Sequence, residues 1–495
     1  MSIAARASAF AALALLGGVG TVYAPVPTFT AVAVLFAVGL WAFAGSRQPS
    51  PAGPKISEEE RIKPRSTTVT RLVSGYLLVF WLANIAPLAA YSPRESAGIS
   101  ASQGSLSNQV LISSFGLVGA LFLPAAIRRF DGTFQWLVAL WILYLGWAAA
   151  SSIWSIYPPL TIRNVVAFVL VSVGCFGLGA GFYGSLPNGR DLFLRHVFWA
   201  SVLSALVILL PLPFRFQQYD LLDPSQSLEI GGNFPAYVTR PVVVSLLALA
   251  ATSILGVRRW LKRDWFWVAV LVLPLLALKS RGPIVWGMLA LGIFYLFYKT
   301  SIRDRVLQAG SLFMIGVGTY IYYSEHVLQT IFAPLVPYLT LGNVEATRKL
   351  TGRVPLWQAL IEQVWQHPWL GAGFAAFWNP LNISRVIPSD VSVQTSAHNG
   401  YLEELLNTGV VGLTLLLAFC LGTLTVALRR ARRGDPLGWL VFLFMVFFLL
   451  LNLTNALTQE YFQPPFVIIL IALGLLASGP ATDPATSPRT ADSPP

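Results

Sequence analysis

Residues 134–154 read FQWLVALWILYLGWAAASSIW, an apolar run that contains no charged side chain. A helix of ~20 such residues is long enough to cross the ~30 Å hydrocarbon core of a bilayer. Comparable runs recur along the chain, which has 495 residues, 55% of them hydrophobic and only 11% charged. Because soluble domains contain about 25% charged residues, this composition excludes a water-soluble enzyme and predicts an all-α polytopic membrane protein.

The hydropathy pattern predicts about fourteen transmembrane helices. They lie near residues 7–23, 26–45, 73–90, 109–127, 134–154, 164–183, 193–213, 240–256, 265–279, 283–298, 306–323, 409–428, 437–452 and 464–478. The first span also has the features of a signal peptide cleaved near Ala24, an alternative that leaves the later topology unchanged.

These spans divide the chain into six segments. We expect helices 1 and 2 in residues 1–45, a cytoplasmic linker in 46–72, helices 3 to 11 in 73–323, a large periplasmic loop in 324–408, helices 12 to 14 in 409–478 and a cytoplasmic tail in 479–495. The tail is rich in Pro, Ser, Thr and Asp, so it has too little apolar surface to fold and is expected to be disordered.

The formal net charge is +12. In a soluble protein this would suggest a nucleic-acid partner, but here the basic residues lie between apolar runs. If alternate loops are assigned to the cytoplasm, beginning with the N-terminus, most of the 33 Lys and Arg residues fall on the cytoplasmic side, as the positive-inside rule requires. This distribution favours a topology with both termini in the cytoplasm. It also indicates that the basic residues interact with the membrane and not with a nucleic acid.

The long loop, residues 324–408, is the first place to look for chemistry, because loops of this size are usually functional. Within it, Thr351 can cap a helix that has Pro355 in its first turn. An apolar stripe follows at helical spacing and ends at His367-Pro368; it comprises Leu356, Trp357, Leu360, Ile361, Val364 and Trp365. We expect this helix to lie on the membrane or against the bundle, followed at interfacial depth by a glycine-rich aromatic loop at 371–378.

A second helix is predicted to begin at Ser396, as its cap, and to run into the twelfth span after Gly409. His398 would then lie in the first turn, where the helix dipole disfavours the imidazolium form. A neutral imidazole is what a general base requires. Capping or packing is the alternative role, and the commoner one for an isolated histidine.

Several basic residues are predicted on the same side of the membrane. Lys279 and Arg281 lie in a tight turn between two spans, where a charge is costly and therefore suggests function, although snorkelling to the interface is the alternative. Arg353 lies at a helix start, where a cation is disfavoured unless an anion binds. Arg240 is a weaker candidate with a structural alternative. Guanidinium groups at this depth suit a diphosphate, whose oxygens they bind in pairs.

Other chemistries lack support in the sequence. The outer segments contain no HExxH motif, no nucleotide P-loop and no DxD-like carboxylate pair, and the only two cysteines, Cys175 and Cys420, lie inside apolar runs. These observations argue against a disulfide scaffold, a Cys-based metal cluster and nucleotide-sugar chemistry. We therefore expect no metal and no cofactor.

The second half of the chain contains a series of short motifs. In chain order they are Ser280-Arg281-Gly282-Pro283, Thr351-Gly352-Arg353, Leu356-Trp357, residues 367–374, Phe377-Trp378, residues 398–403 and residues 409–412. Together, over roughly residues 230–460, these motifs resemble the O-antigen ligase and O-antigen polymerase superfamily. The pair Phe377-Trp378 is closer to the exopolysaccharide-polymerase branch. Where the family often has His-Pro-Asn, this chain has Asn233-Phe234-Pro235, which leaves the role of Arg240 open.

The resemblance implies a GT-C-like enzyme of the bacterial inner membrane that acts on the periplasmic side without a metal, typically with inversion. It would move a glycan from undecaprenyl diphosphate to an acceptor sugar, which is another lipid-linked glycan for a polymerase and lipid A-core for a ligase. Arg281 and Arg353 would hold the diphosphate, and His398 would take the proton of the acceptor hydroxyl. The remaining residues would position the histidine or line the substrate site: Asn399, Tyr401, Glu403, Lys279, Arg240, Trp357 and Trp378.

Two other functions fit a protein with many spans and basic residues on one side. A transporter or flippase of lipid-linked oligosaccharides would place polar side chains in the middle of several spans, and these spans are nearly free of them. A non-catalytic partner in a polysaccharide assembly complex would work with chain-length and export proteins. Those proteins are also expected partners of the enzyme.

Overall fold

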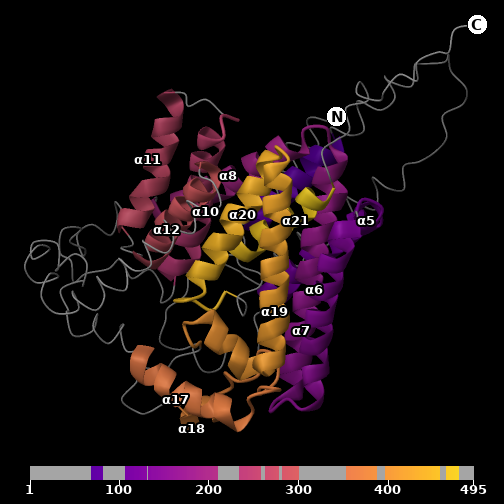
Figure 1. Ribbon diagram of the computed structural model, residues 1–495, viewed down its shortest axis with the longest axis vertical. Coiled ribbons are helices and arrows are strands. Elements are labelled where there is room, and N and C mark those ends of the chain that lie inside the picture. Colours follow the sequence, from indigo (N-terminus) through magenta and orange to yellow (C-terminus); the bar gives the residue numbers. More distant parts are fainter. Residues whose placement is uncertain are drawn as a thin grey trace, which may run out of the picture.

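The computed structural model describes residues 68–81, 106–130, 132–209, 234–257, 262–277, 281–299, 353–386, 396–457 and 464–478. Within these ranges the secondary structure is entirely helical, and no strand occurs (Figure 1). The predicted all-α class is therefore confirmed for this part of the chain. The predicted spans at 7–23, 26–45 and 306–323 and the tail at 479–495 lie outside the described residues.

The helices before the long loop follow the hydropathy pattern. They are the helix Thr68–Trp81, α5 (Leu106–Ile127), α6 (Gly132–Ala150), α7 (Pro158–Phe176), the π-helical turn η2 (Gly177–Phe182), α8 (Gly189–Leu209), α10 (Phe234–Ile254), α11 (Lys262–Ala277) and α12 (Arg281–Lys299). Short 3₁₀ turns, η1 (Ser151–Ile153) and η3 (Tyr183–Ser185), follow α6 and η2. Each predicted span from 73–90 to 283–298 overlaps one of these helices, and residues 82–90, 210–213 and 278–279 of the predicted spans lie outside the described residues. The first of them begins at Thr68, inside the range predicted as linker.

The described residues from position 353 onward form five helices. These are α17 (Arg353–Gln366), α18 (Pro380–Val386), α19 (Gly400–Arg432), α20 (Pro436–Leu451) and α21 (Pro464–Ala477). Among all the residues that the structure describes, four helical segments are both long and apolar enough to cross a membrane, namely Gln109–Ile127, Phe134–Ile153, Pro158–Ser185 and Gly400–Arg432. The others are shorter apolar helices, among them α20 and α21. This composition is consistent with a membrane protein.

The centre of the bundle is formed by α20 and α21, which α19, α10 and α7 contact (Figure 1). Every residue of α21 is buried, as is most of α20. A helix that is apolar on all sides belongs in the interior of a large bundle or a membrane. Small residues allow the closest helix contacts: a Cβ on Gly119 of α5 would lie only 2.3 Å from the Cα of Gly174 in α7, as is common between membrane helices.

The two ends of the bundle differ in composition. At one end, Arg190 at the start of α8 forms a bidentate ion pair with Asp435, with Nη1–Oδ1 at 2.8 Å and Nη2–Oδ2 at 3.0 Å. Asp435 also caps α20, and exposed arginines end α19 nearby. At the opposite end lie α17, α18 and the start of α19, at the bottom of Figure 1. The described segments that carry His398, Trp357 and Trp378 belong to this second end, which we call the site end.

Candidate active site

The start of α19 places His398. Asn399 is the N-cap of the helix, and its Oδ1 accepts hydrogen bonds from the backbone N–H groups of Tyr401 at 3.0 Å and Leu402 at 3.1 Å. His398 precedes the cap and has a left-handed backbone with φ 49°, while its N–H donates to Oγ of Ser396 at 3.0 Å. The prediction that Ser396 caps the helix and His398 lies in its first turn was therefore wrong, because the amide of Asn399 caps as well as a serine does.

Glu403 fixes the backbone just before His398. The carboxyl group is fully buried, and its Oε2 accepts the N–H of Ala397 at 2.7 Å. Its Oε1 accepts the indole N–H of Trp378 at 2.5 Å and Nδ2 of Asn407 at 3.0 Å. All three partners donate, so the side chain acts as an acceptor and links the 371–378 loop to the segment that carries His398. The predicted roles, Glu403 in positioning the histidine or the sugar and Trp378 in binding substrate, stay predictions, and the described contacts of the Glu403 carboxylate are with protein groups.

The glycine-rich loop is held against α19 by its backbone. Gly373 donates to the carbonyl of Asn407 at 2.9 Å, and Val410 donates to that of Pro368 at 2.8 Å. Gly409 has φ 69° and kinks α19 at this point. A Cβ on Gly409 would lie 2.2 Å from the carbonyl oxygen of Trp369, so only glycine allows the loop to pack so closely.

The helix α17 lies across the site end and packs against the same segment. Leu356 and Leu360 are buried beside Ala397 and Phe377, and the indole N–H of Trp357 donates to the carbonyl of Ala397 at 2.8 Å. Trp357 therefore supports the residue before His398.

The predicted apolar stripe of α17 does not form one buried face. Ile361 is 47% exposed and Trp365 is 74% exposed. The six positions extend over about half of the helix circumference, so one side can face protein while the other faces outward, and the expectation that this helix lies on the membrane or against the bundle stays a prediction on the outward side. Only the side that carries Leu356 and Leu360 faces protein.

The predicted cations are distributed over three helices. Arg240 is buried in α10, with 3% of its surface exposed, and its Nη2 donates to Oδ1 of Asn455 at 2.8 Å. Arg281 is the first residue of α12, and Arg353 is the first residue of α17. Their side chains, and the whole of Lys279, lie outside the described part of the chain.

A turn that sequence reasoning missed contacts α10, α12 and the start of α19. It is formed by residues 452–457, between α20 and α21, and three of its members bond to the start of α19, to α10 and to α12. Asn407, which bonds to Glu403, was missed as well. The only sequence signals were the i, i+4 spacing of Glu403 and Asn407 and a polar Asn-Leu-Thr-Asn sequence directly after an apolar run.

Tyr401, a further predicted site residue, is bonded to protein. Its hydroxyl donates to the carbonyl of Leu449 in α20 at 2.7 Å. Together with the cap at Asn399, this bond fixes the first turn of α19 against α20. The predicted role of Tyr401, to position the histidine or the sugar, stays a prediction.

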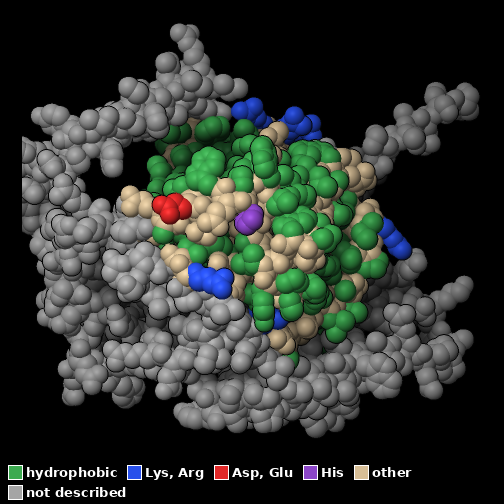
Figure 2. All heavy atoms as spheres, turned by 90° about the horizontal axis from the view of Figure 1, so that it is seen from below, with side chains coloured by type: hydrophobic (Ala, Val, Ile, Leu, Met, Phe, Trp, Pro, Cys, Tyr) green, Lys and Arg blue, Asp and Glu red, His purple; other side chains and the backbone are tan. Residues whose placement is uncertain are grey.

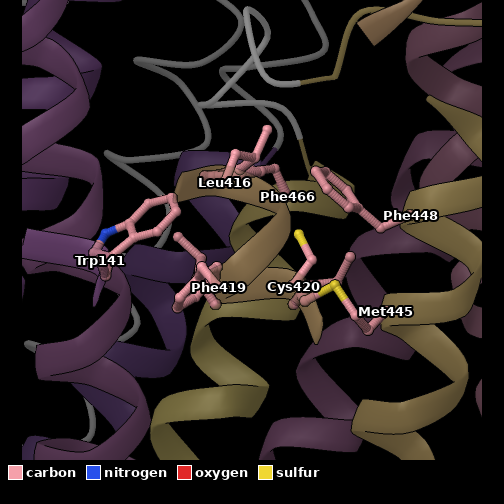
Figure 3. A pocket seen from close by; sticks show the side chains of 9 residues that line it. Trp141, Leu416, Phe419, Cys420, Met445, Phe448 and Phe466 are labelled. Atoms are coloured by element: carbon pink, nitrogen blue, oxygen red, sulfur yellow. The ribbon is translucent and has the colours of Figure 1, made fainter. Parts of the chain in front are cut away.

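A small cavity opens elsewhere, between α6, α19, α20 and α21 (Figure 3). Its lining consists of uncharged side chains: Trp141, Leu416, Phe419, Cys420, Met445, Phe448, Phe466, Ile469 and Leu470. Such a lining offers no partner for a phosphate or a sugar hydroxyl, so the cavity is not the candidate site. Within the described ranges, no group of three or more His, Cys, Asp or Glu residues could hold a metal ion.

Comparison with known proteins gives a family match over part of the chain. A family model described as O-antigen ligase matches residues 266–417. The chain is 26% identical over 195 residues to the General O-oligosaccharyltransferase of Acinetobacter baylyi, covering 35% of this chain and 32% of that protein. It is 25% identical over 288 residues to the Exopolysaccharide production protein ExoQ of Rhizobium meliloti, covering 56% of this chain and 62% of that protein.

The chain thus spans less than two thirds of the length of both curated relatives. The matched residues 266–417 include α12, α17, the glycine-rich loop and the start of α19 with His398. The resemblance predicted from the motifs is therefore confirmed, and residues 266–417 are the part of this chain that matches the O-antigen ligase family.

Proposed function

We propose that the protein is a membrane glycosyltransferase that moves a glycan from undecaprenyl diphosphate to an acceptor sugar, in the polymerisation or ligation of an exopolysaccharide or O-antigen. The match to the O-antigen ligase family and the similarity to an oligosaccharyltransferase and an exopolysaccharide production protein support this class of reaction. The single observation that carries the proposal is the convergence of Arg240, the start of α12 and the segment of His398 on one turn at the site end.

In the proposed reaction, His398 accepts the proton of the acceptor hydroxyl. The hydroxyl oxygen forms a bond to the anomeric carbon of the donor, and the bond from that carbon to the diphosphate breaks, leaving its electron pair on the diphosphate. Attack from the face opposite the leaving group inverts the configuration. A histidine positioned in this way contributes typically 10²–10⁴-fold to the rate.

The leaving group needs positive charge, and two helix starts supply it. Arg281 begins α12 and Arg353 begins α17. The N-terminus of a helix directs unpaired backbone N–H groups and the positive end of its dipole at an anion. A guanidinium at the same point adds bidentate hydrogen bonds to phosphate oxygens. We propose that both arginines bind the diphosphate and stabilise its charge as it leaves, with Lys279 nearby, so that no metal is required.

We further propose that the protein has about fourteen spans, with both termini in the cytoplasm of a bacterium and the site end facing the periplasm. The ion pair and the exposed arginines at the opposite end support this orientation through the positive-inside rule. Figure 2, which looks onto the site end, shows hydrophobic side chains over much of its described surface. Ile153, Trp365 and Trp369, which follow α6 or belong to α17 and the residues after it, are strongly exposed, as expected for residues at the depth of lipid head groups.

The test supplies purified protein with lipid-linked repeat units, in the presence and absence of lipid A-core. A ladder of products without the core identifies a polymerase, and a product that requires the core identifies a ligase. Arg353→Ala and Arg281→Ala should each reduce transfer by about 10²-fold or more, whereas Arg385→Ala, an exposed arginine in α18, serves as the matched control. Transfer at the wild-type rate by both variants, or no transfer by the wild type with either acceptor, would overturn the proposal.

A further inference from the structure

The turn 452–457 contains polar side chains at the end of an apolar helix. Asn452 is 2% exposed and Asn455 is 9% exposed, although α20, which precedes them, is apolar throughout its second half. A buried amide is costly unless its hydrogen bonds are satisfied. The turn therefore needs partners, and it finds them on three other helices.

Each contact of the turn leads to an element that carries a predicted site residue. The carbonyl of Asn452 accepts the N–H of Gly400, two residues after His398, at 2.7 Å. Oγ1 of Thr454 accepts the indole N–H of Trp286, in the second turn of α12, at 2.8 Å.

The third contact reaches α10, where Oδ1 of Asn455 accepts Nη2 of Arg240 at 2.8 Å. In addition, a Cβ on Gly282, the residue after Arg281, would lie 3.7 Å from Oγ1 of Thr454. The backbone at the start of α12 therefore lies directly beside the turn.

The turn is itself rigid. Nδ2 of Asn452 donates to the carbonyl of Phe448 at 2.9 Å, and its Oδ1 accepts the N–H of Leu457 at 3.1 Å. A Cβ on Gly400 would lie only 1.9 Å from the same Oδ1. Because Oδ1 is held by Leu457, the side chain cannot move aside freely, so the start of α19 has one position against the turn.

We propose that turn 452–457 is the positioning platform of the site, which sets the start of α19, the start of α12 and Arg240 relative to one another. The proposal rests on the proposed function, since it assigns these elements to one reaction. Asn452, Thr454 and Asn455 touch neighbouring helices through their hydrogen bonds and are positioning residues. Their effect is on geometry, and a displacement of about 1 Å in a reacting group can cost ~10²-fold in rate.

The test uses the bond between Thr454 and Trp286, because the acceptor can be removed with little change in volume and the donor can be removed while an aromatic ring is kept. Thr454→Val removes the acceptor and Trp286→Phe removes the donor, and each should lower kcat by about ten-fold with a smaller change in KM. If one hydrogen bond carries the effect, the double variant should be no slower than the slower single variant. Thr454→Ser keeps the hydroxyl and should restore most of the rate.

Leu453→Ala provides the matched control, since Leu453 lies in the same turn with its side chain 39% exposed. This variant should keep the wild-type kcat. Melting temperatures in detergent identify a purely structural role: variants with lowered melting temperatures but wild-type kcat at permissive temperature overturn the platform.

If the wild type is active and Thr454→Val has the same kcat as the wild type, the platform proposal alone is overturned. A wild type without glycan transfer overturns the proposed function, and the platform with it. The two failures are therefore distinguished by the wild-type reaction measured in the same experiment.

Discussion

The indole N–H of Trp378 donates to Oε1 of Glu403 at 2.5 Å, and so connects the glycine-rich loop to the first turn of α19. The other carboxylate oxygen accepts the N–H of Ala397 at 2.7 Å. Because Asn407 also donates to this carboxylate, three donors meet two oxygens. Only a group with acceptors at both positions satisfies this arrangement, and a carboxylate is such a group.

Glu403→Gln should therefore reduce glycan transfer by about ten-fold or more, because its NH₂ group must face one of the three donors and leave it unpaired. Trp378→Phe removes one donor and leaves both oxygens bonded, so its effect should be smaller. The measurement is kcat for purified variants, with the melting temperature as a check on folding. A Glu403→Gln enzyme that is as fast as the wild type would show that this carboxylate does not position the site.

The backbone of His398 allows a sharper test of the general base than an alanine variant. With φ at 49°, the position suits glycine without strain and asparagine better than most residues. His398→Gly should keep the fold and lose about 10²–10⁴-fold in transfer rate. Added imidazole should restore part of the rate in proportion to its concentration and should not accelerate the wild type.

His398→Asn is the control for the cavity that glycine leaves, and imidazole should not rescue it because the amide occupies the space. If both variants retain wild-type transfer, the proton of the acceptor goes elsewhere. If imidazole rescues neither variant although both fold, the imidazole of His398 serves packing, which is the commoner role of an isolated histidine.

The helical architecture could be predicted from the sequence because a bilayer allows few alternatives. Runs such as 134–154 and 437–452 are long enough and apolar enough to be helices, and the structure has α6 and α20 there. The continuation of the 396–408 segment into the following span was also predicted, and α19 runs from Gly400 to Arg432 with a kink at Gly409. These features depend on composition and local spacing, which the sequence contains directly.

The contacts that organise the site could not be predicted in this way. Gly400 and Asn452, or Arg240 and Asn455, are far apart in the chain, and each residue alone resembles a residue of an ordinary turn. The residue that caps α19 was also predicted wrongly, since Ser396 and Asn399 are both good N-caps and only the backbone conformation decides between them. The sequence therefore singled out candidate residues, and the structure was needed to show which other residues contact them.

The kink at Gly409 leads to a prediction about stability. Gly409→Ala should be strongly destabilising, because its Cβ would meet the Trp369 carbonyl at 2.2 Å and because φ at 69° strains any residue with a Cβ, at about 1–3 kcal/mol. Gly434 supplies the control: its φ is 88°, but a Cβ there would meet nothing within 4 Å. Gly434→Ala should therefore lower the melting temperature in detergent less than Gly409→Ala does, and equal losses would mean that the loop yields to the added methyl group.

The outward side of α17 predicts where the site end meets the membrane. Ile361 and Trp365 are exposed although they are apolar, and helices of this kind lie in the interface with their apolar side in the acyl chains. Gln366 is also exposed, and it lies about 140° around the helix from Ile361. If α17 rests on the outer leaflet, the two positions should be in different surroundings.

A spin label on Ile361→Cys should collide mainly with oxygen, which concentrates in lipid, and a label on Gln366→Cys mainly with a water-soluble nickel chelate. The native Cys175 and Cys420 are both buried, so the introduced cysteine is the preferred site of labelling, and the unsubstituted protein gives the background. Equal access of the nickel chelate to both labels would place α17 in water. In that case the exposed side chains of Trp365 and Trp369 would contact water or another protein and not lipid. The donor diphosphate would then have to reach Arg353 away from the membrane surface.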